Sequence, residues 1–220
     1  MDTAPRSGLS LLRILQLLIL LGMFLAAALL YRVLPEQIPT HWNFMGQVDQ
    51  YSGKVFGTFL LPSVALVLSL LFPLFQRIDP KRENYAAFAH AWEVFQLALV
   101  GFMAYIFAVQ MYTSLHPEAS VLVGRFVMFG IGVLLILMGN YMGKIRQNFF
   151  VGLRTPWTIA DPEVWGKSQR FGGWCFVLGG LAIIVVSILW VAVPALLISI
   201  FVFVVFLPMV YSYMLFRRKN

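Results

Sequence analysis

The stretch that decides the fold is residues 171–216, which read FGGWCFVLGGLAIIVVSILWVAVPALLISIFVFVVFLPMVYSYMLF. One straight helix of these 46 residues would be about 70 Å long, roughly twice the thickness of the hydrocarbon core of a bilayer. The stretch must therefore turn back once. Pro194 has no backbone donor and disfavours helix at Val193, so we predict the reversal at residues 190–195. Two membrane-spanning helices result.

Four further apolar runs are long enough for a spanning helix, which needs about 20 residues. They cover residues 11–31, 55–75, 94–113 and 126–142, and charged or turn-rich segments separate them. The chain of 220 residues is 60% hydrophobic and 11% charged, with a mean hydropathy of +0.84, which excludes an ordinary soluble domain. We therefore predict an all-α integral membrane protein with six transmembrane helices.

The distribution of positive charge predicts the orientation, because short cytoplasmic loops carry an excess of Lys and Arg. With the N-terminus inside, 13 of the 16 Lys and Arg residues are cytoplasmic. The others are Arg32, Lys54 and Arg125, which lie at predicted helix ends. An odd number of helices would put the basic residues 217–219 outside, so we expect both termini in the cytoplasm. The net charge of +7 then indicates topology and contact with anionic lipid rather than nucleic-acid binding.

A cleaved signal peptide is an alternative interpretation of the first apolar run. Arg6 and Arg13 supply positive charge near its beginning, and the alanines at 26–28 resemble a cleavage region. The run is longer than the apolar part of a signal peptide, which spans about 7 to 15 residues. We favour a retained helix.

The segment at residues 32–54, predicted to lie outside, is rich in turn-forming and aromatic residues. Pro35 and Pro39 stiffen its beginning, and Gly46 and Gly53 permit tight turns. One interpretation is a cap at the membrane interface, where Trp and Tyr are enriched whatever the function. The other is a recognition surface of polar side chains beside aromatic anchors. The candidate recognition residues are His41, Trp42, Asn43, Asp49, Tyr51 and Lys54.

The segment at residues 143–171, predicted to lie inside, contains a helix start. Asp161 can accept hydrogen bonds from the first amides of the helix, and Pro162 suits the first helical position. We predict a short amphipathic helix that leads into the fifth span, with Glu163 and Lys167 paired on its wet side. The side chains expected to face the membrane interface are Val164, Trp165 and Ser168.

Small residues predict where helices come close together. Gly139 and Gly143 are one helical turn apart, a spacing that lets another helix approach. Cys175 is the single cysteine, so an intramolecular disulfide is excluded, and it lies within an apolar span as a small filler.

The sequence offers little for catalysis or metal binding. Its three histidines lie in separate segments, and no catalytic residues, metal ligands or cofactor are predicted. The nearest candidate is His90 with Glu93, which share a helix face at i,i+3, but two ligands do not make a closed metal site. We predict that the protein is not an enzyme.

A small-solute or ion-coupled transporter is the competing function. Four prolines in the apolar runs, at 62, 73, 194 and 208, would permit broken helices around a substrate. Ion-coupled pathways usually place acids or histidines near the membrane midplane, and the spans contain almost none apart from Glu93 at their margin. The sequence favours a noncatalytic membrane protein over a transporter.

Both polar segments resemble those of the SdpI immunity-protein family of bacterial membrane proteins, and the resemblance covers most of the chain. The Arg-Thr-Pro-Trp-Thr run at 154–158 is its most specific part. Gln169 is a departure, because the family tends to place a histidine before the arginine. The matching residues outside are Leu34, Pro35, Ile38, Pro39, His41, Gly46, Asp49, Tyr51 and Lys54, and those inside are Gly139, Asn140, Asn148, the run 152–158, Trp165 and Arg170.

The resemblance implies a multi-pass protein of the bacterial cytoplasmic membrane that confers immunity to a secreted antimicrobial peptide. It also implies a receptor that captures a transcriptional repressor at the membrane. The expected partners are the lipid bilayer, a peptide toxin outside and a repressor inside, without direct nucleic-acid contact; a homo-oligomer stays open, as does an envelope-stress sensor without a toxin.

The resemblance also implies a division of the chain and a set of cytoplasmic contact residues. Residues 1–75 correspond to an N-terminal membrane domain of unknown function with the outer loop 32–54. Residues 76–220 correspond to the SdpI-like four-helix region with the inner loop 143–171. The candidate partner-binding residues inside are Asn148, Gly152, Arg154, Thr155, Pro156, Trp157, Thr158, Trp165 and Arg170.

Overall fold

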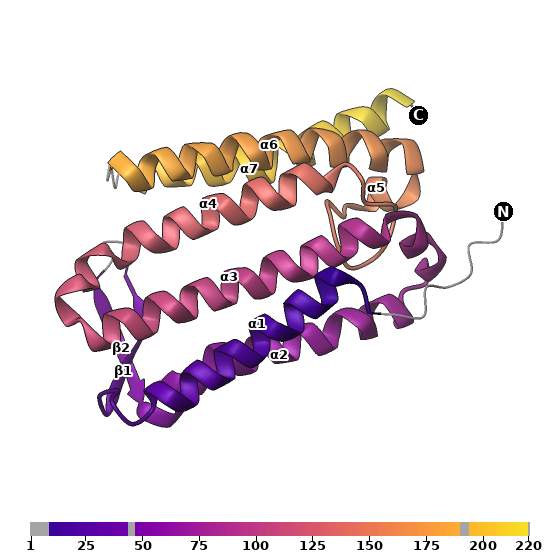
Figure 1. Cartoon of the computed structure of the whole chain (residues 1–220). Coiled ribbons are helices and arrows are strands. Elements are labelled where there is room, and N and C mark those ends of the chain that lie inside the picture. Colours follow the sequence, from indigo (N-terminus) through magenta and orange to yellow (C-terminus); the bar gives the residue numbers. More distant parts are fainter. Residues whose placement is uncertain (1–8, 44–46, 190–193, 220) are drawn as a thin grey trace.

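The computed structural model describes residues 9–43, 47–189 and 194–219 as a bundle of long helices (Figure 1). Within these residues, six helical segments are long and apolar enough to cross a membrane, as predicted. The long helices are α1 (Leu11–Leu30), α2 (Lys54–Ile78), α3 (Ala89–Leu115), α4 (Val123–Met142), α6 (Pro162–Leu189) and α7 (Pro194–Lys219). The 3₁₀ turns η1 (Arg82–Phe88) and η2 (Pro117–Leu122) precede α3 and α4.

The two ends of the bundle differ. A two-stranded hairpin, β1 (Gln37–Trp42) and β2 (Val48–Gly53), lies at one end, and the short helix α5 (Pro156–Ala160) lies at the other (Figure 1). We call these the hairpin end and the α5 end. The start of α1 and the end of α7 both lie at the α5 end (Figure 1), as an even number of crossings requires. Which end is cytoplasmic stays a prediction.

The beginning of the fifth span differs from the prediction. The helix predicted to begin at Asp161-Pro162 is not a separate amphipathic helix, because it is the first part of α6, which runs without a break from Pro162 to Leu189. The predicted start is confirmed: the Asp161 carboxylate accepts hydrogen bonds from the backbone N–H groups of Glu163 at 2.7 Å and Val164 at 3.1 Å. Pro194 begins α7, and of the predicted reversal at 190–195, residues 190–193 lie outside the described residues.

The predicted orientation of this first part of α6 was wrong. Val164, Trp165 and Ser168 are buried inside the protein rather than turned to the membrane interface. The Trp165 indole donates a hydrogen bond to the Ile145 carbonyl oxygen at 2.9 Å. The inner loop folds back over this face of α6, which hydropathy alone did not indicate.

Glycine contacts bring α4 and α6 together. A Cβ atom on Gly139 would lie 2.6 Å from the Gly173 carbonyl oxygen, and one on Gly180 would lie 2.6 Å from the Gly132 carbonyl oxygen. The two pairs lie seven residues apart on each helix, and the helices run in opposite directions. The predicted close approach at Gly139 is confirmed, and Gly143 lies against Arg170, where an added Cβ would be 3.1 Å from the Arg170 Cγ.

The first three helices pack around a separate apolar cluster that includes Leu20, Ala65 and Val100. The Gln16 side-chain amide donates to the Ser69 hydroxyl at 3.0 Å, so a polar pair also links α1 to α2. A hydrogen bond between spanning helices contributes about 0.6 to 2 kcal/mol. The cluster positions α1 and α2, whose connection is the hairpin.

Candidate functional site

The outer segment folds into an antiparallel hairpin that the sequence did not predict. The strands pair Gln37 with Gly53 and Trp42 with Val48, with irregular register near His41. The alternation of Ile38, Thr40 and Trp42 before the glycine at 46 is the signal that could have indicated a strand. Two short strands are marginal in isolation, so the hairpin depends on its attachment to the helices.

The hairpin is fastened to α2 and α3. Ile38 is fully buried and fills the space left by Gly57, where an added Cβ would lie 2.4 Å from the Ile38 Cβ. The buried amide of Gln110 on α3 donates to the Pro39 carbonyl oxygen at 2.8 Å. The backbone of β1 is therefore held on the bundle, and its outward side chains have a defined position.

Three of the candidate recognition residues are exposed on the hairpin. His41 Nδ1 lies 2.5 Å from Asp49 Oδ1, and the two side chains are 61% and 42% exposed. Tyr51 is exposed on the same strand as Asp49. We call His41, Asp49 and Tyr51 the exposed polar group, because their side chains remain accessible on the surface of the hairpin.

The other three candidates are tied into the protein. Asn43 closes the hairpin turn, because its side-chain oxygen accepts the Gln47 backbone N–H at 3.0 Å. Lys54 begins α2, lies 3.4 Å from Glu36 Oε1 and is 14% exposed. The Trp42 side chain is partly buried, and its indole nitrogen has no hydrogen-bond partner among the described residues. We infer structural roles for Asn43 and Lys54.

At the α5 end, the inner loop is built around a buried carboxylate that the sequence reasoning missed. Asp79 follows α2 and is 2% exposed. It accepts hydrogen bonds from the Tyr85 hydroxyl at 2.8 Å, the Phe149 backbone N–H at 2.9 Å and the Lys81 backbone N–H at 2.7 Å. One side chain thus joins the end of α2, η1 and the inner loop. The Asp79-Pro80 dipeptide repeats the pattern of Asp161-Pro162 and was a usable signal.

Gln147 is a second organising residue that the sequence reasoning missed. Its amide nitrogen donates to the carbonyl oxygens of Thr158 at 2.9 Å and Ile159 at 2.8 Å, and its side-chain oxygen accepts from Lys81. Asn84 donates to the Gln147 backbone carbonyl at 2.7 Å. The loop is therefore fastened to both η1 and α5.

Asn148 and Gly152 shape the middle of the loop. The buried Asn148 side chain accepts from the N–H groups of Phe150 at 2.9 Å and Val151 at 2.8 Å, and donates to the Val151 carbonyl at 3.1 Å. Gly152 has φ of 100°, which disfavours a side chain there, and an added Cβ would lie 2.8 Å from the Gln169 side-chain oxygen. Both residues serve the loop conformation.

Gln169, the departure from the family pattern, is fully buried against this loop. Its side chain accepts the Leu153 N–H at 3.0 Å and donates to the Leu153 carbonyl at 3.0 Å. A carboxamide presents a donor and an acceptor side by side, whereas an imidazole presents them on separated ring positions. Glutamine therefore suits this contact to a single residue's backbone.

The Arg-Thr-Pro-Trp-Thr run forms and anchors α5. Thr155 and Thr158 form a reciprocal capping box, in which the Thr155 N–H donates to the Thr158 hydroxyl at 2.8 Å, and Pro156 takes the first helical turn. The Trp157 indole donates to the Ser212 hydroxyl on α7 at 2.5 Å. The threonines are buried, whereas Arg154 and Pro156 are exposed. The run is first a folding motif.

Charged residues cover the outside of the inner loop. Arg154 donates to the Phe149 carbonyl, and Arg170 is exposed beside Gly143. Lys219, at the end of α7, lies 2.6 Å from Asp161 Oδ2. The hydrogen bond from Lys219 is the main reason that the pKa of Asp161 lies below its ordinary value, and the Val164 N–H adds to the effect.

The residues considered for metal binding have other partners. Glu93 lies 3.3 Å from Arg13 Nε, and the His90 ring packs against the Tyr141 ring at 5.8 Å between centroids. Within the described ranges, no group of three or more His, Cys, Asp or Glu side chains is placed to hold a metal ion.

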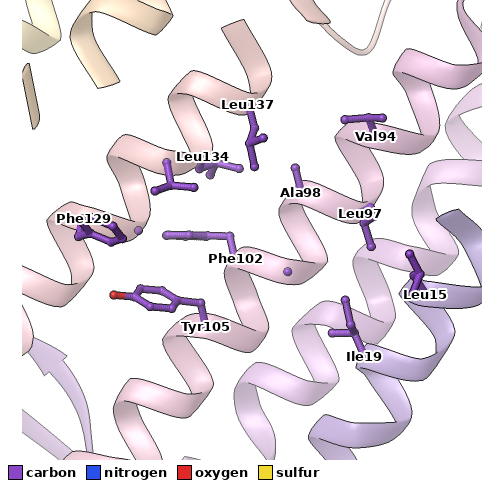
Figure 2. A pocket seen from close by; sticks show the side chains of 13 residues that line it. Leu15, Ile19, Val94, Leu97, Ala98, Phe102, Tyr105, Phe129, Leu134 and Leu137 are labelled. Atoms are coloured by element: carbon purple, nitrogen blue, oxygen red, sulfur yellow. The ribbon is translucent and has the colours of Figure 1, made fainter. Parts of the chain in front are cut away.

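An apolar groove lies within the membrane-spanning part of the bundle. It has a volume of about 430 Å³ between α1, α3 and α4, with Ile19, Phe102 and Leu134 on its walls (Figure 2). Tyr105 is the single lining residue with an ionisable side chain, and its hydroxyl donates to the Phe126 carbonyl at 2.8 Å. The lining offers apolar contact rather than charge to couple to an ion.

Comparison with known proteins gives matches in both halves of the chain. Residues 144–212 match the SdpI/YfhL protein family, and residues 18–66 match a domain of unknown function, DUF1648. The chain is 30% identical over 177 residues to the immunity protein SdpI of Bacillus subtilis (strain 168), which covers 79% of this chain and 80% of that protein. No solved structure matches the chain. The division at residue 75 or 76 stays a prediction.

Proposed function

The chain belongs to the SdpI family of multi-pass bacterial membrane proteins, and from this premise we propose that it protects the cell that makes it against a membrane-active antimicrobial peptide. The observation that carries the proposal is the 30% identity to an immunity protein across four fifths of both chains. We assign the protein a binding role without a catalytic step.

We place recognition of the peptide on the exposed polar group of the hairpin. His41 and Asp49 form an exposed pair, and Tyr51 adds an aromatic side chain that suits the membrane interface. Because Ile38 and Gln110 hold the hairpin on the helices, binding there needs little ordering of the backbone. The orientation predicted from charge puts this end outside, where a secreted peptide arrives.

A second proposed activity is capture of a transcriptional repressor at the α5 end. Arg154 and Arg170 are the exposed members of the predicted partner-binding set that carry charge. They lie on a folded loop at the end that we expect in the cytoplasm, and they suit a partner with an acidic surface. The buried members, including Asn148, Thr158 and Trp165, support the loop rather than touch the partner.

Survival of toxin-sensitive bacteria tests the immunity proposal. Cells that express the chain are challenged with a panel of membrane-active peptides, and wild type is compared with His41→Ala and Asp49→Ala. Gln50→Ala is the matched control, because Gln50 is an exposed neighbour on the same strand. We expect protection by wild type and by the control, and reduced protection by the other two at equal membrane levels. Wild type that protects against no peptide would contradict the proposal.

The receptor activity has a separate readout. After a sublethal peptide challenge, the transcript of the chain's own gene is measured in cells with wild type, Arg154→Ala or Lys167→Ala. Lys167 is an exposed cation on α6 outside the predicted set and serves as the control. Induction lost only in Arg154→Ala, with survival and membrane levels unchanged, is the expected result. Equal induction in all three would remove Arg154 from the proposal.

A further inference from the structure

Three arginines from separate elements line one groove at the α5 end. Arg13 lies in the first turn of α1, Arg77 in the last turn of α2, and Arg82 begins η1. Together with Pro73 and Gln76 they enclose a groove of about 420 Å³. We call this the arginine groove. The family matches at residues 18–66 and 144–212 include none of its members.

The positive charge in this groove is largely uncompensated. Arg13 uses its Nε for Glu93, at 3.3 Å. Within residues 9–43, 47–189 and 194–219, Arg77 and Arg82 have no hydrogen bond or ion pair through their guanidinium groups. The nearest acid along the chain is Glu83, beside Arg82.

Asp79 does not neutralise the groove, although it lies two residues from Arg77. Its carboxylate is buried and already accepts hydrogen bonds from Tyr85, Phe149 and the Lys81 backbone. The guanidinium groups are exposed while this acid is committed to the inner loop. The groove therefore has both the space and the unused donors to bind an anion.

Apolar side chains on the same helices indicate what kind of anion. Leu74 and Ile78 on α2 and Leu11 on α1 are exposed large apolar side chains within one turn of the arginines. The groove thus lies where the lipid-facing surface ends and the polar loops begin. An anion that carries acyl chains satisfies both neighbouring surfaces, whereas a soluble anion uses only the guanidinium groups.

We propose that the arginine groove binds the phosphate of an anionic phospholipid headgroup in the leaflet at the α5 end, with the acyl chains along the exposed apolar side chains of α2. A guanidinium group presents a planar fork of donors that matches two phosphate oxygens. Three such groups around one phosphate also join α1 to the distant segment formed by the end of α2 and η1. This site is independent of the proposed recognition of a peptide at the hairpin.

The test compares the full-length protein in nanodiscs of phosphatidylcholine that contain a minor fraction of either phosphatidylglycerol or a matched fluorescent phosphatidylcholine. Native mass spectrometry after extraction counts the lipids retained. The test variant is Arg77→Gln with Arg82→Gln. The control is Arg217→Gln with Arg218→Gln, which removes the same charge from exposed positions at the end of α7. Arg13 is left unchanged because it pairs with Glu93.

We expect wild type and the control to retain phosphatidylglycerol in preference to phosphatidylcholine, and the groove variant to lose that preference by about tenfold or more, because two charge-assisted contacts are removed. An unchanged thermal unfolding midpoint of the groove variant would show that its lost lipid preference is not caused by a folding defect. Equal loss in groove variant and control would overturn the proposal, since general surface charge would then explain retention. Displacement of the retained lipid by millimolar inorganic phosphate would overturn the lipid assignment in favour of a soluble phosphate site.

Discussion

The two polar ends of this protein use their side chains in opposite ways. On the hairpin, His41, Asp49 and Tyr51 remain exposed, and the attachment to the bundle comes from Ile38 and Gln110. In the inner loop, most of the polar side chains of the family motif are buried and satisfied within the protein. The many motif residues of the inner loop therefore make the contacts that its conformation requires. The fewer motif residues of the hairpin leave side chains available for a partner.

The largest effect that tests this comparison is expected when Asp79 is substituted and the free energy of unfolding is measured. Asp79→Ala leaves the buried Tyr85 hydroxyl and two partly buried backbone N–H groups without their acceptor. An unsatisfied buried group costs about 1 to 3 kcal/mol, so we expect a loss of about 3 kcal/mol or more in the free energy of unfolding in detergent. Asp49→Ala, which removes an exposed acid on the hairpin, is expected to change it by less than about 0.5 kcal/mol. Similar losses in the two variants would contradict the contrast between the ends.

The next effect concerns the departure from the family motif. Gln169→His introduces the residue that the family tends to have, but only one of the two bonds to Leu153 can then form. We expect a loss of about 1 to 2 kcal/mol in the free energy of unfolding, measured by denaturant titration in micelles. Gln50→His on the exposed strand is the control. A Gln169→His variant as stable as wild type would show that the carboxamide pair is replaceable.

A smaller effect is expected where the motif reaches α7. Trp157→Phe keeps the apolar ring against Tyr213 but removes the donor to Ser212. The net contribution of such a bond is about 0.5 to 1.5 kcal/mol, and we expect a loss in that range. Ser212→Ala in the same background should then add little, because the two residues share one interaction. Fully additive losses would argue against the contact.

The smallest effect is a pH dependence at the surface of the α5 end. The pKa of Asp161 is held below its ordinary value near 3.8 by Lys219, so its contribution to stability is complete above that value and is lost as the pH falls through the lower folded-state pKa. Thermal unfolding midpoints between about pH 6 and pH 3 should fall less steeply in Lys219→Met than in wild type. Arg218→Met is the control, because it removes a neighbouring charge without touching the pair. Identical pH profiles for all three proteins would contradict the assignment.

Several local features were predictable because they depend on nearby residues. Asp161 accepts the first amides of α6 as its position before Pro162 predicts, and Gly139 permits the close approach to α6 that its lack of a side chain predicts. Both predictions concern the chemistry of one helix end or one helix face. The sequence could not show whether a helix face packs against the membrane or against another part of the protein. Val164 and Trp165 were predicted to face the membrane interface and are buried inside the protein.

The sequence by itself determined the number and approximate limits of the spanning helices, because a bilayer demands an apolar run of fixed length with its backbone hydrogen bonds made internally. It also determined the family. Only the tertiary structure decided that Asp79 and Gln147 organise the inner loop and that Arg13, Arg77 and Arg82 meet in one groove. Arg13 and Gln147 are distant along the chain from the segment that carries Arg77, Asp79 and Arg82, and their meeting depends on how the helices pack rather than on hydropathy.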